Sequence, residues 1–262
     1  MEPSAADTGG LPDLGPWPGL ELTGPVDAGA RSRVWRGRRH GEAVAIRHSR
    51  RAAGSLDWEL DLLGLLDANG FTVPTVVAAD DGRPHVDGVV VQRWLAGAQP
   101  ATASDWRLIG RELVRLHALT ADHPQRPGCC RVDELHRHRR SVDADLDRVP
   151  AAVAELAVEI FASVADAPVG VVHGDVHATN LRIGADGLVG FLDWDESRVD
   201  VVWHDLSVLD AGLLGAAGLD RVTTERASVL SHAWEVVNAW TAEPDYARHR
   251  LGLLHAAIDH PG

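Results

Sequence analysis

The sequence predicts an α+β fold in two parts, a mainly β N-terminal part followed by a mainly helical C-terminal part. Between residues 20 and 95, short alternating apolar runs are separated by turn signals, and a single helical pattern lies among them. From residue 96 onward, apolar residues recur mostly at helical spacing. The exception is the turn signal Gly184-Ala-Asp-Gly187, which lies between two apolar runs and predicts a β-hairpin within the helical part.

The composition is typical of a globular protein with one large domain or two lobes. Of the 262 residues, 45% are hydrophobic and 24% are charged. No apolar run approaches the roughly 20 residues that span a bilayer, and no signal-peptide pattern is present, so we expect a cytoplasmic protein without a membrane partner. The net charge of −13 argues against nucleic-acid binding, which requires a basic surface. Cys129 and Cys130 are adjacent, and we expect both thiols to be free.

The N-terminal part starts with residues 1–19, which are rich in Pro, Gly and Ala and predict a loose arm. Beyond it, alternation and turn signals predict strands, and Ser55 is the expected N-cap of one helix that Gly70 stops. The expected elements are strands at 34–38, 43–47, 73–79 and 86–92 and a helix from Ser55 to Asn69.

The C-terminal part is expected to be helical on both sides of the hairpin. Trp106, Ile109, Leu113 and Leu116 recur at helical spacing and predict an amphipathic helix that begins near Ser104. Further helices are expected at 133–147, 151–165, 206–214, 223–240 and 246–258.

The polar residues around the hairpin form the strongest candidate site. His173-Gly174-Asp175 precedes the hairpin, Asn180 lies just before its first strand and Asp193 just after its second. Pairing of the two strands would bring Asn180 beside Asp193, and their oxygens are ligands that Mg²⁺ accepts together with substrate phosphates. With the carboxylate of Asp175 for an incoming hydroxyl, the set suits phosphoryl transfer.

This spacing resembles the aminoglycoside phosphotransferase family, whose members have a protein-kinase-like fold. The resemblance covers residues 20–262 and is specific only at 173–195. It implies a two-lobed protein-kinase-like fold, with an N-lobe at 20–95, a helical C-lobe at 96–262 and ATP bound between them. It also implies transfer of the γ-phosphate of ATP to a hydroxyl of a small molecule.

The resemblance assigns roles to the residues of the candidate site. Asp175 would orient and finally deprotonate the acceptor hydroxyl, and Asn180 and Asp193 would hold Mg²⁺. His173 is included in the catalytic set, although a structural role in the loop fits it better than that of a base. Asp205 would tie down the catalytic loop.

Two residues near the hairpin have alternative interpretations. Asp195 suits a second metal ligand about as well as an exposed or capping residue. His177 suits packing of the loop better than metal binding.

Nucleotide-binding residues follow from the resemblance in the N-lobe. Gly29 and Ser32 fall in the loop that covers the phosphates in such proteins, but the usual glycine pattern is degraded there and an ordinary hairpin is an alternative. Gln92 and Trp94 fall in the hinge that pairs with adenine.

Arg47 stands where the family usually has a phosphate-binding lysine. The chain has no lysine, since all 25 of its basic residues are arginines. A guanidinium is always charged and grips phosphate oxygens in a fork, but its bulk leaves catalytic efficiency open. Glu59 lies on the apolar face of its helix and would hold Arg47 toward the phosphates. Alternatively, Arg47 is a solvent-exposed residue at the end of its strand, and Glu59 lies in water at the edge of the apolar face.

The identity of the acceptor is only indicated by charge. Acids outnumber arginines in residues 200–262, where the family shapes its acceptor site, and Asp210, Glu235, Glu243 and Asp245 are candidates. We therefore expect a cationic acceptor such as an aminoglycoside or another antibiotic, with resistance as the biological role. A neutral sugar or amino alcohol is the second expectation, and a non-catalytic nucleotide-binding pseudokinase is the rival class. A monomer or weak homodimer is expected.

Overall fold

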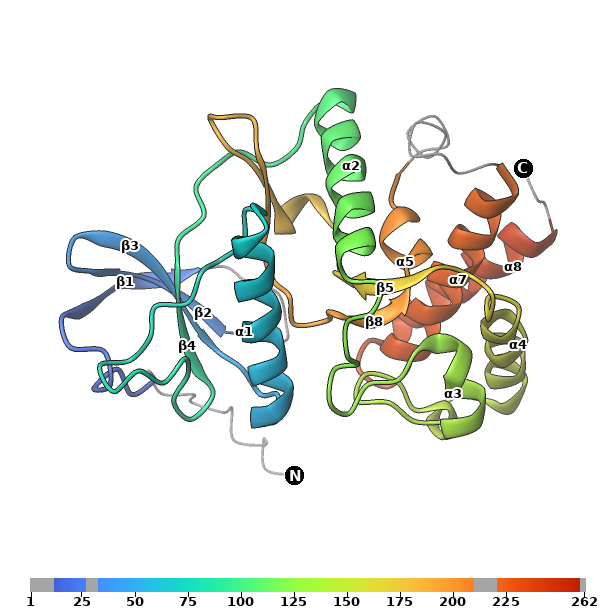
Figure 1. Ribbon diagram of the computed structural model, residues 1–262. Helices are drawn as coiled ribbons and strands as arrows, with labels where there is room; N and C mark the ends of the chain where they lie inside the picture. Colours follow the sequence, from blue (N-terminus) through green and yellow to red (C-terminus); the bar gives the residue numbers. More distant parts are fainter. Residues whose placement is uncertain (1–11, 27–32, 210–220, 260–262) are drawn as a thin grey trace. The chain divides into compact units, whose positions relative to one another are not determined.

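The structure is a computed structural model that describes residues 12–26, 33–209 and 221–259. The chain divides into two compact units, which are described separately. The N-terminal unit comprises residues 1–69 and 73–95, and the C-terminal unit comprises residues 70–72 and 96–262. The first is built on a β-sheet and the second mainly on helices, so the predicted α+β class is confirmed (Figure 1). None of the helices in the described ranges is long and apolar enough to cross a bilayer.

The N-terminal unit contains a four-stranded antiparallel sheet in the order β1-β2-β3-β4 and one long helix. Register places Val34 of β2 opposite Arg47 of β3, and Arg47 opposite Val90 of β4, so these side chains share one face. The opposite face carries the apolar core, with Trp35 and Ile46 among its members. The elements are β1 (Leu20–Val26), β2 (Arg33–Arg39), β3 (Glu42–His48), α1 (Ala53–Ala68) and β4 (Val89–Arg93).

Four expectations for the N-terminal unit are corrected. The strand expected at 86–92 begins only at Val89, because Asp87 and Gly88 form a turn with φ of 49° and 79°. Trp17, expected in the loose arm, is 1% exposed and donates from Nε1 to the carbonyl of Val77 at 2.8 Å, because its indole completes the core under the sheet. The helix begins two residues earlier than expected, after Ala52, and Ser55 is buried in its first turn. Residues 73–79 are no strand, because only an isolated bridge from Val76 joins them to β4.

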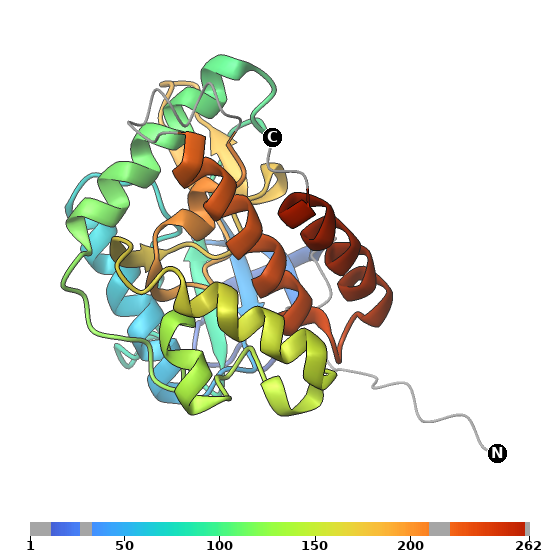
Figure 2. The same ribbon diagram turned by 90° about the vertical axis from the view of Figure 1, so that its right-hand side faces the viewer.

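The C-terminal unit combines helices with two small two-stranded sheets, β5-β8 and β6-β7. In Figure 2 the helices α7 and α8 lie side by side, as their extensive mutual contact requires. The helices are α2 (Ala103–Leu119), α3 (Val132–His138), α4 (Ala151–Ala162), α5 (Trp203–Leu206), α7 (Arg221–Ala239) and α8 (Pro244–Asp259). The strands are β5 (Val169–Val172), β6 (Leu181–Ile183), β7 (Val189–Phe191) and β8 (Arg198–Val201).

Most of the helical expectations for this unit are confirmed, and two are corrected. Thr102 caps α2, and its hydroxyl accepts from the backbone N–H of Asp105 at 3.2 Å in a capping box. The helix expected at 133–147 ends instead at His138, because Arg139 adopts a left-handed conformation with φ of 56°. The helix expected at 206–214 is wrong over its described part, because α5 ends at Leu206 and residues 207–209 form a turn, and residues 210–214 lie outside the described residues.

Candidate active site

The loop between β5 and β6 holds the three residues His173, Gly174 and Asp175. Asp175 is exposed, and the side chain of Asn180 reaches back to it. Nδ2 of Asn180 donates to the carboxylate Oδ2 of Asp175 at 2.8 Å and to its carbonyl at 3.1 Å. Asn180 ends the short 3₁₀ turn Ala178–Asn180, which places the amide next to Asp175. The loop thus presents one carboxylate to solvent with one oxygen already oriented by an amide.

The predicted hairpin is confirmed. Its register places Asn180 beside Leu192, the residue directly before Asp193. Leu181 lies opposite Phe191, and the N–H of Leu192 donates to the carbonyl of Asn180 at 2.8 Å. Asp193 follows directly and has φ of 54°, a left-handed conformation that Asp tolerates better than most residues. The backbone therefore leaves the ladder at Asp193, and the two predicted metal ligands sit at the same end of the hairpin.

The buried carboxylate of Asp205 anchors residues 173–180, the predicted catalytic loop, through His173 and Gly174. Its Oδ2 accepts from the backbone N–H of His173 at 2.7 Å, and its Oδ1 accepts from that of Gly174 at 3.0 Å. Burial alone raises the pKa of Asp205, but the hydrogen bond from His117 and the neighbouring histidine and backbone dipoles outweigh it, so the pKa lies below its usual value. The loop-anchoring position that we expected for Asp205 is therefore confirmed by these contacts.

His117 was not singled out from the sequence. It lies at the end of α2 and donates from Nε2 to Oδ2 of Asp205 at 3.0 Å. Gly170 of β5 lets this helix end approach, since a Cβ there would lie 2.9 Å from the carbonyl of His117. One signal was available, because position 117 follows Leu113 by four residues on the apolar face of α2.

His173 is buried, and both of its ring nitrogens contact backbone groups. Nε2 donates to the carbonyl of Leu192 at 2.7 Å, and Nδ1 accepts from the N–H of Asp175 at 3.3 Å. Its ring packs on Trp194 with 4.8 Å between centroids. His173 therefore ties the catalytic loop to the hairpin, and its geometry favours the structural interpretation over that of a base.

The donor set at the end of the hairpin fits a magnesium ion. Nδ2 of Asn180 points to Asp175, which leaves the amide oxygen for a cation, and Asp193 adds an exposed carboxylate. Mg²⁺ takes few protein ligands and completes its shell with phosphates and water. No cluster of three or more His, Cys, Asp or Glu side chains suited to a metal occurs in the described ranges, as expected for so sparse a site. His177 is exposed and contacts the hydroxyl of Thr179 at 3.2 Å, and Asp195 is half-buried.

In the N-terminal unit, Arg47 and Glu59 form the expected ion pair. Both side chains are buried, Glu59 to 1% exposure, and Nη2 of Arg47 contacts Oε1 of Glu59. Asp57 and Asp61 on the same helix are exposed, as their positions on the helix predicted. A buried carboxylate requires a partner, and β3 supplies it on the face opposite the apolar core.

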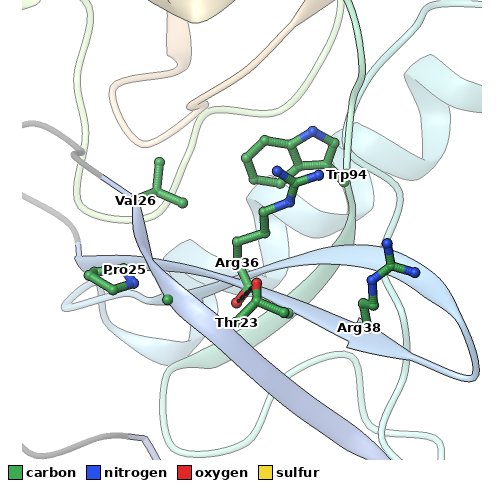
Figure 3. Close-up of a pocket in the computed structure, with 8 residues that line it drawn as sticks. Thr23, Pro25, Val26, Arg36, Arg38 and Trp94 are labelled. Atoms are coloured by element: carbon green, nitrogen blue, oxygen red, sulfur yellow. Dashed lines mark hydrogen bonds between the residues drawn. The ribbon is translucent and has the colours of Figure 1, made fainter.

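The other expected nucleotide-binding residues of this unit occupy different settings. Trp94 lies beside a groove of about 590 Å³, where the guanidinium of Arg36 stacks 4.7 Å from its ring centroid (Figure 3). Gln92 is buried, and its Nε2 donates to the carbonyl of Pro74 at 3.4 Å, so its side-chain amide takes part in a hydrogen bond within the unit. Gly29 and Ser32 lie outside the described residues.

The sequence model described as the phosphotransferase enzyme family matches residues 23–252, which is most of the chain. The chain belongs to this family. The match includes the loop, the hairpin and both candidate metal ligands, and it confirms the family resemblance on which the site was predicted.

A curated relative of this chain is the homoserine kinase of Methylobacterium nodulans. The two are 29% identical over 184 residues, which make up 63% of this chain and 55% of that protein. The chain therefore spans about half the length of this curated relative.

Solved structures similar to this chain are small-molecule kinases, and they confirm the protein-kinase-like fold. An amicoumacin kinase, solved with AMP-PNP and Ca²⁺, has a TM-score of 0.68 and 16% identity, covering 91% of this chain and 88% of that one. A microcompartment-associated aminopropanol kinase has a TM-score of 0.63 and 18% identity over 91% and 90% of the two chains. Choline kinase from Streptococcus pneumoniae has a TM-score of 0.63 and 13% identity over 91% and 93%.

Proposed function

We propose that this chain transfers the γ-phosphate of ATP to a hydroxyl group of a small cationic molecule. The observation that carries the proposal is the arrangement of Asp175, Asn180 and Asp193 at one end of the hairpin. A phosphotransferase needs a group that orients the attacking hydroxyl and oxygen ligands for a divalent cation. These three side chains supply both, on a loop that Asp205 holds by two backbone hydrogen bonds.

Asp175 is the proposed orienting carboxylate and final proton acceptor. Asn180 already holds its Oδ2, so Oδ1 is the oxygen that would accept the hydrogen bond of the incoming hydroxyl. Because the transition state of phosphoryl transfer is loose, positioning matters more than the basicity of the carboxylate. His173 supports this geometry from the backbone side and takes no proton in the proposal.

Asn180 and Asp193 would hold Mg²⁺, and Arg47 would contact the phosphates. When bound, Mg²⁺ neutralises charge on the phosphate oxygens. A guanidinium serves the same purpose through paired N–H donors, and Glu59 fixes its direction. We propose that residues 20–95 supply the nucleotide contacts, with Trp94, Gln92, Gly29 and Ser32 in the adenine and phosphate regions. Residues 96–262 would supply the catalytic loop and the acceptor contacts.

A cationic acceptor is supported by charge and by the names of the relatives. The chain carries a net charge of −13. In the C-terminal unit, Glu235 accepts from the hydroxyl of Tyr246 at 3.2 Å and Glu243 is exposed, whereas Asp245 is paired with Arg248 at 2.5 Å and Asp210 lies outside the described residues. Aminopropanol and choline each combine a hydroxyl with a cationic nitrogen, whereas homoserine carries a carboxylate beside its ammonium and has no net charge. Acids near an acceptor site attract cationic molecules.

The proposal is tested by ATP consumption with a panel of acceptors. Aminoglycosides, other cationic antibiotics, aminopropanol and choline form the cationic arm, and sugars and zwitterionic homoserine form the arm without net charge. We expect a cationic molecule to be the best acceptor, with a KM that rises with ionic strength at saturating Mg-ATP, because charge pairs are screened over about 10 Å at 0.1 M salt. A sugar or homoserine as best acceptor would overturn the cationic part alone.

The second candidate is a nucleotide-binding protein without turnover. Arginine at position 47, in place of the usual lysine, is the observation that favours it. Binding of ATP without consumption by any member of the panel would support this candidate against the enzyme.

A further inference from the structure

The chain that follows the hairpin leaves several backbone carbonyls in the protein interior. After Asp193 it belongs to no strand until β8 begins at Arg198, and Trp194 and Ser197 are buried in this stretch. Buried carbonyls outside a ladder need donors from elsewhere. The carbonyl of Trp194 accepts within the segment from the hydroxyl of Ser197 at 2.6 Å and from its N–H at 3.1 Å. The carbonyls of Asp195 and Ser197 obtain a donor from Arg126, which lies about 70 residues earlier in the chain and also contacts the carbonyl of Trp194.

A single nitrogen of Arg126, Nη1, contacts all three of these carbonyls. Nη1 donates to the carbonyl of Trp194 at 3.2 Å and to those of Asp195 and Ser197 at 2.9 Å each. It also contacts the hydroxyl of Ser197 at 3.4 Å. The side chain is 1% exposed, so these contacts form away from water, where a charged donor is strong.

Gln125 fixes the position of Arg126. Its Oε1 accepts from the backbone N–H of Arg126 at 2.8 Å and from that of Val199 at 3.0 Å. Its Nε2 donates to the carbonyl of Val199 at 2.7 Å. The Gln125 amide therefore pairs with β8 as a strand residue would, and Gln125 and Arg126 together hold residues 194–199.

The held segment is continuous with the candidate metal ligand. Asp193 directly precedes Trp194, whose Nε1 donates back to the carbonyl of Phe191 at 3.2 Å. Gly174 of the catalytic loop lies against the same segment, since a Cβ there would come within 2.6 Å of the carbonyl of Glu196. Movement of residues 194–197 would therefore change the direction of the Asp193 carboxylate.

We propose that Arg126 is a positioning residue for the metal-ligating carboxylate of Asp193, acting through the carbonyls of Trp194, Asp195 and Ser197. The inference rests on the proposed function, because it takes Asp193 as a ligand of Mg²⁺. When a residue that orients a metal ligand through hydrogen bonds is replaced, metal affinity typically falls by about 10–100-fold. We therefore expect replacement of Arg126 to reduce the increase in nucleotide affinity that Mg²⁺ provides.

The test measures ADP binding by calorimetry, with Mg²⁺ and with EDTA, and compares the ratio of the two affinities. Arg126→Met should keep the affinity for metal-free ADP within about three-fold of wild type and lower the ratio by about 10-fold or more. Arg126→Lys should give an intermediate ratio, because an ammonium keeps the charge and loses the planar fork. Asp193→Asn alters the proposed metal ligand itself and therefore shows how far the ratio falls when that ligand is lost.

Leu135→Ala is the matched control for lost stability. Leu135 is fully buried in α3, which packs on α4, and its truncation lowers the melting temperature without altering Arg126 or its carbonyl partners. Its ratio should equal that of wild type. If Arg126→Met does not fold, Arg126→Lys decides the matter.

The outcomes separate the inference from the proposed function. If the Arg126 variants keep the wild-type ratio of ADP affinities while Asp193→Asn lowers it, the inference is overturned and the proposed function stands. A wild-type ratio in Asp193→Asn would remove Asp193 as a metal ligand, and the inference would fail with it. No ADP binding by the wild-type chain would overturn the proposed function itself.

Discussion

The two units differ in how they hold the charged side chains of the proposed site. In the N-terminal unit, Arg47 lies beside one buried carboxylate, that of Glu59, on neighbouring β3 and α1. In the C-terminal unit, the catalytic loop is held through its backbone, with Asp205 accepting from two N–H groups and from His117. A backbone anchor fixes the loop whatever side chain it presents, whereas an ion pair fixes only its two members. We therefore expect substitutions to act locally on chemistry in the C-terminal unit and on both stability and binding in the N-terminal unit.

The largest effect is expected at Asp175, whose side chain makes none of the hydrogen bonds by which Asp205 holds the loop and contacts only the Asn180 amide within it. Asp175→Asn removes the proton acceptor and leaves the bonds to Asp205 in place, so turnover should fall by about 10²–10⁴. Affinity for Mg-ATP should stay within a few-fold of wild type. Steady-state kinetics and calorimetric titration measure the two quantities. Turnover within three-fold of wild type would remove Asp175 from its role.

In the N-terminal unit, Glu59→Gln should affect stability as well as binding. Removing one partner of a buried ion pair typically costs about 3–5 kcal/mol, because the remaining charge stays buried. We expect the free energy of unfolding to fall by an amount in this range and the affinity for Mg-ATP to weaken as Arg47 changes direction. Urea denaturation and calorimetry are the measurements, and Asp61→Asn, at an exposed position of the same helix, is the control.

Arg47 itself offers a second test of this unit. Arg47→Ala should weaken ATP binding or turnover, and Arg47→Lys should retain a substantial part of both, because an ammonium still neutralises phosphate charge. Titration of Mg-ATP into the three proteins gives the comparison. Equal affinities and rates in all of them would contradict a phosphate-binding role for Arg47.

A smaller effect is expected at His117, which acts on the catalytic loop only through Asp205. His117→Phe keeps the ring volume and removes one of three hydrogen bonds to the carboxylate, so we expect kcat to fall by roughly 10-fold while the KM for ATP is unchanged. His117→Gln, which retains a donor, should recover part of kcat. A matching rise of KM in both variants would point to general loss of structure instead.

The smallest effect concerns acid stability of the C-terminal unit. Burial lowers the pKa of His204 to about 4. Between this value and the ordinary value of 6.5, the unfolded chain binds a proton that the folded chain does not, so folding stability falls as the pH drops through this window. Urea denaturation between pH 7.5 and 5 should show this slope, and His204→Asn should reduce it. An unchanged slope in the variant would exclude His204 as its source.

The parts of the site that the sequence predicted are those close together along the chain. Asp175, Asn180 and Asp193 lie within a short stretch, and an Asp-Gly turn fixes their relative register. For the Arg47–Glu59 pair, the acid on an apolar helix face indicated that Glu59 needs a partner, and the family resemblance named Arg47 as that partner. Trp17, His117 and Arg126 were missed, since each makes its decisive contact 60 residues or more away, and local periodicity carries no information about such contacts.

The fold prediction also contains local errors. Residues 73–79 are rich in β-branched residues, as strands are, but most of their backbone pairs with no neighbouring strand. Residues 133–147 have helical composition, but the turn at Arg139 ends the helix and ion pairs such as Arg140–Asp145 at 2.8 Å hold the loop that follows. The lack of a strand partner decided residues 73–79 and the backbone turn at Arg139 decided the shorter helix, whereas the Asp-Gly turn decided the hairpin.

The arginine at position 47 has a consequence for chemical proteomics. Reagents that acylate a lysine beside a bound nucleotide require an amine that can lose its proton and attack. The guanidinium of Arg47 remains protonated at any pH that the protein tolerates, and this chain has no lysine to take its place. Nucleotide-directed acyl probes should therefore pass over this protein in a cell extract even when it binds ATP, and surveys that rely on them would underestimate the number of phosphotransferases present.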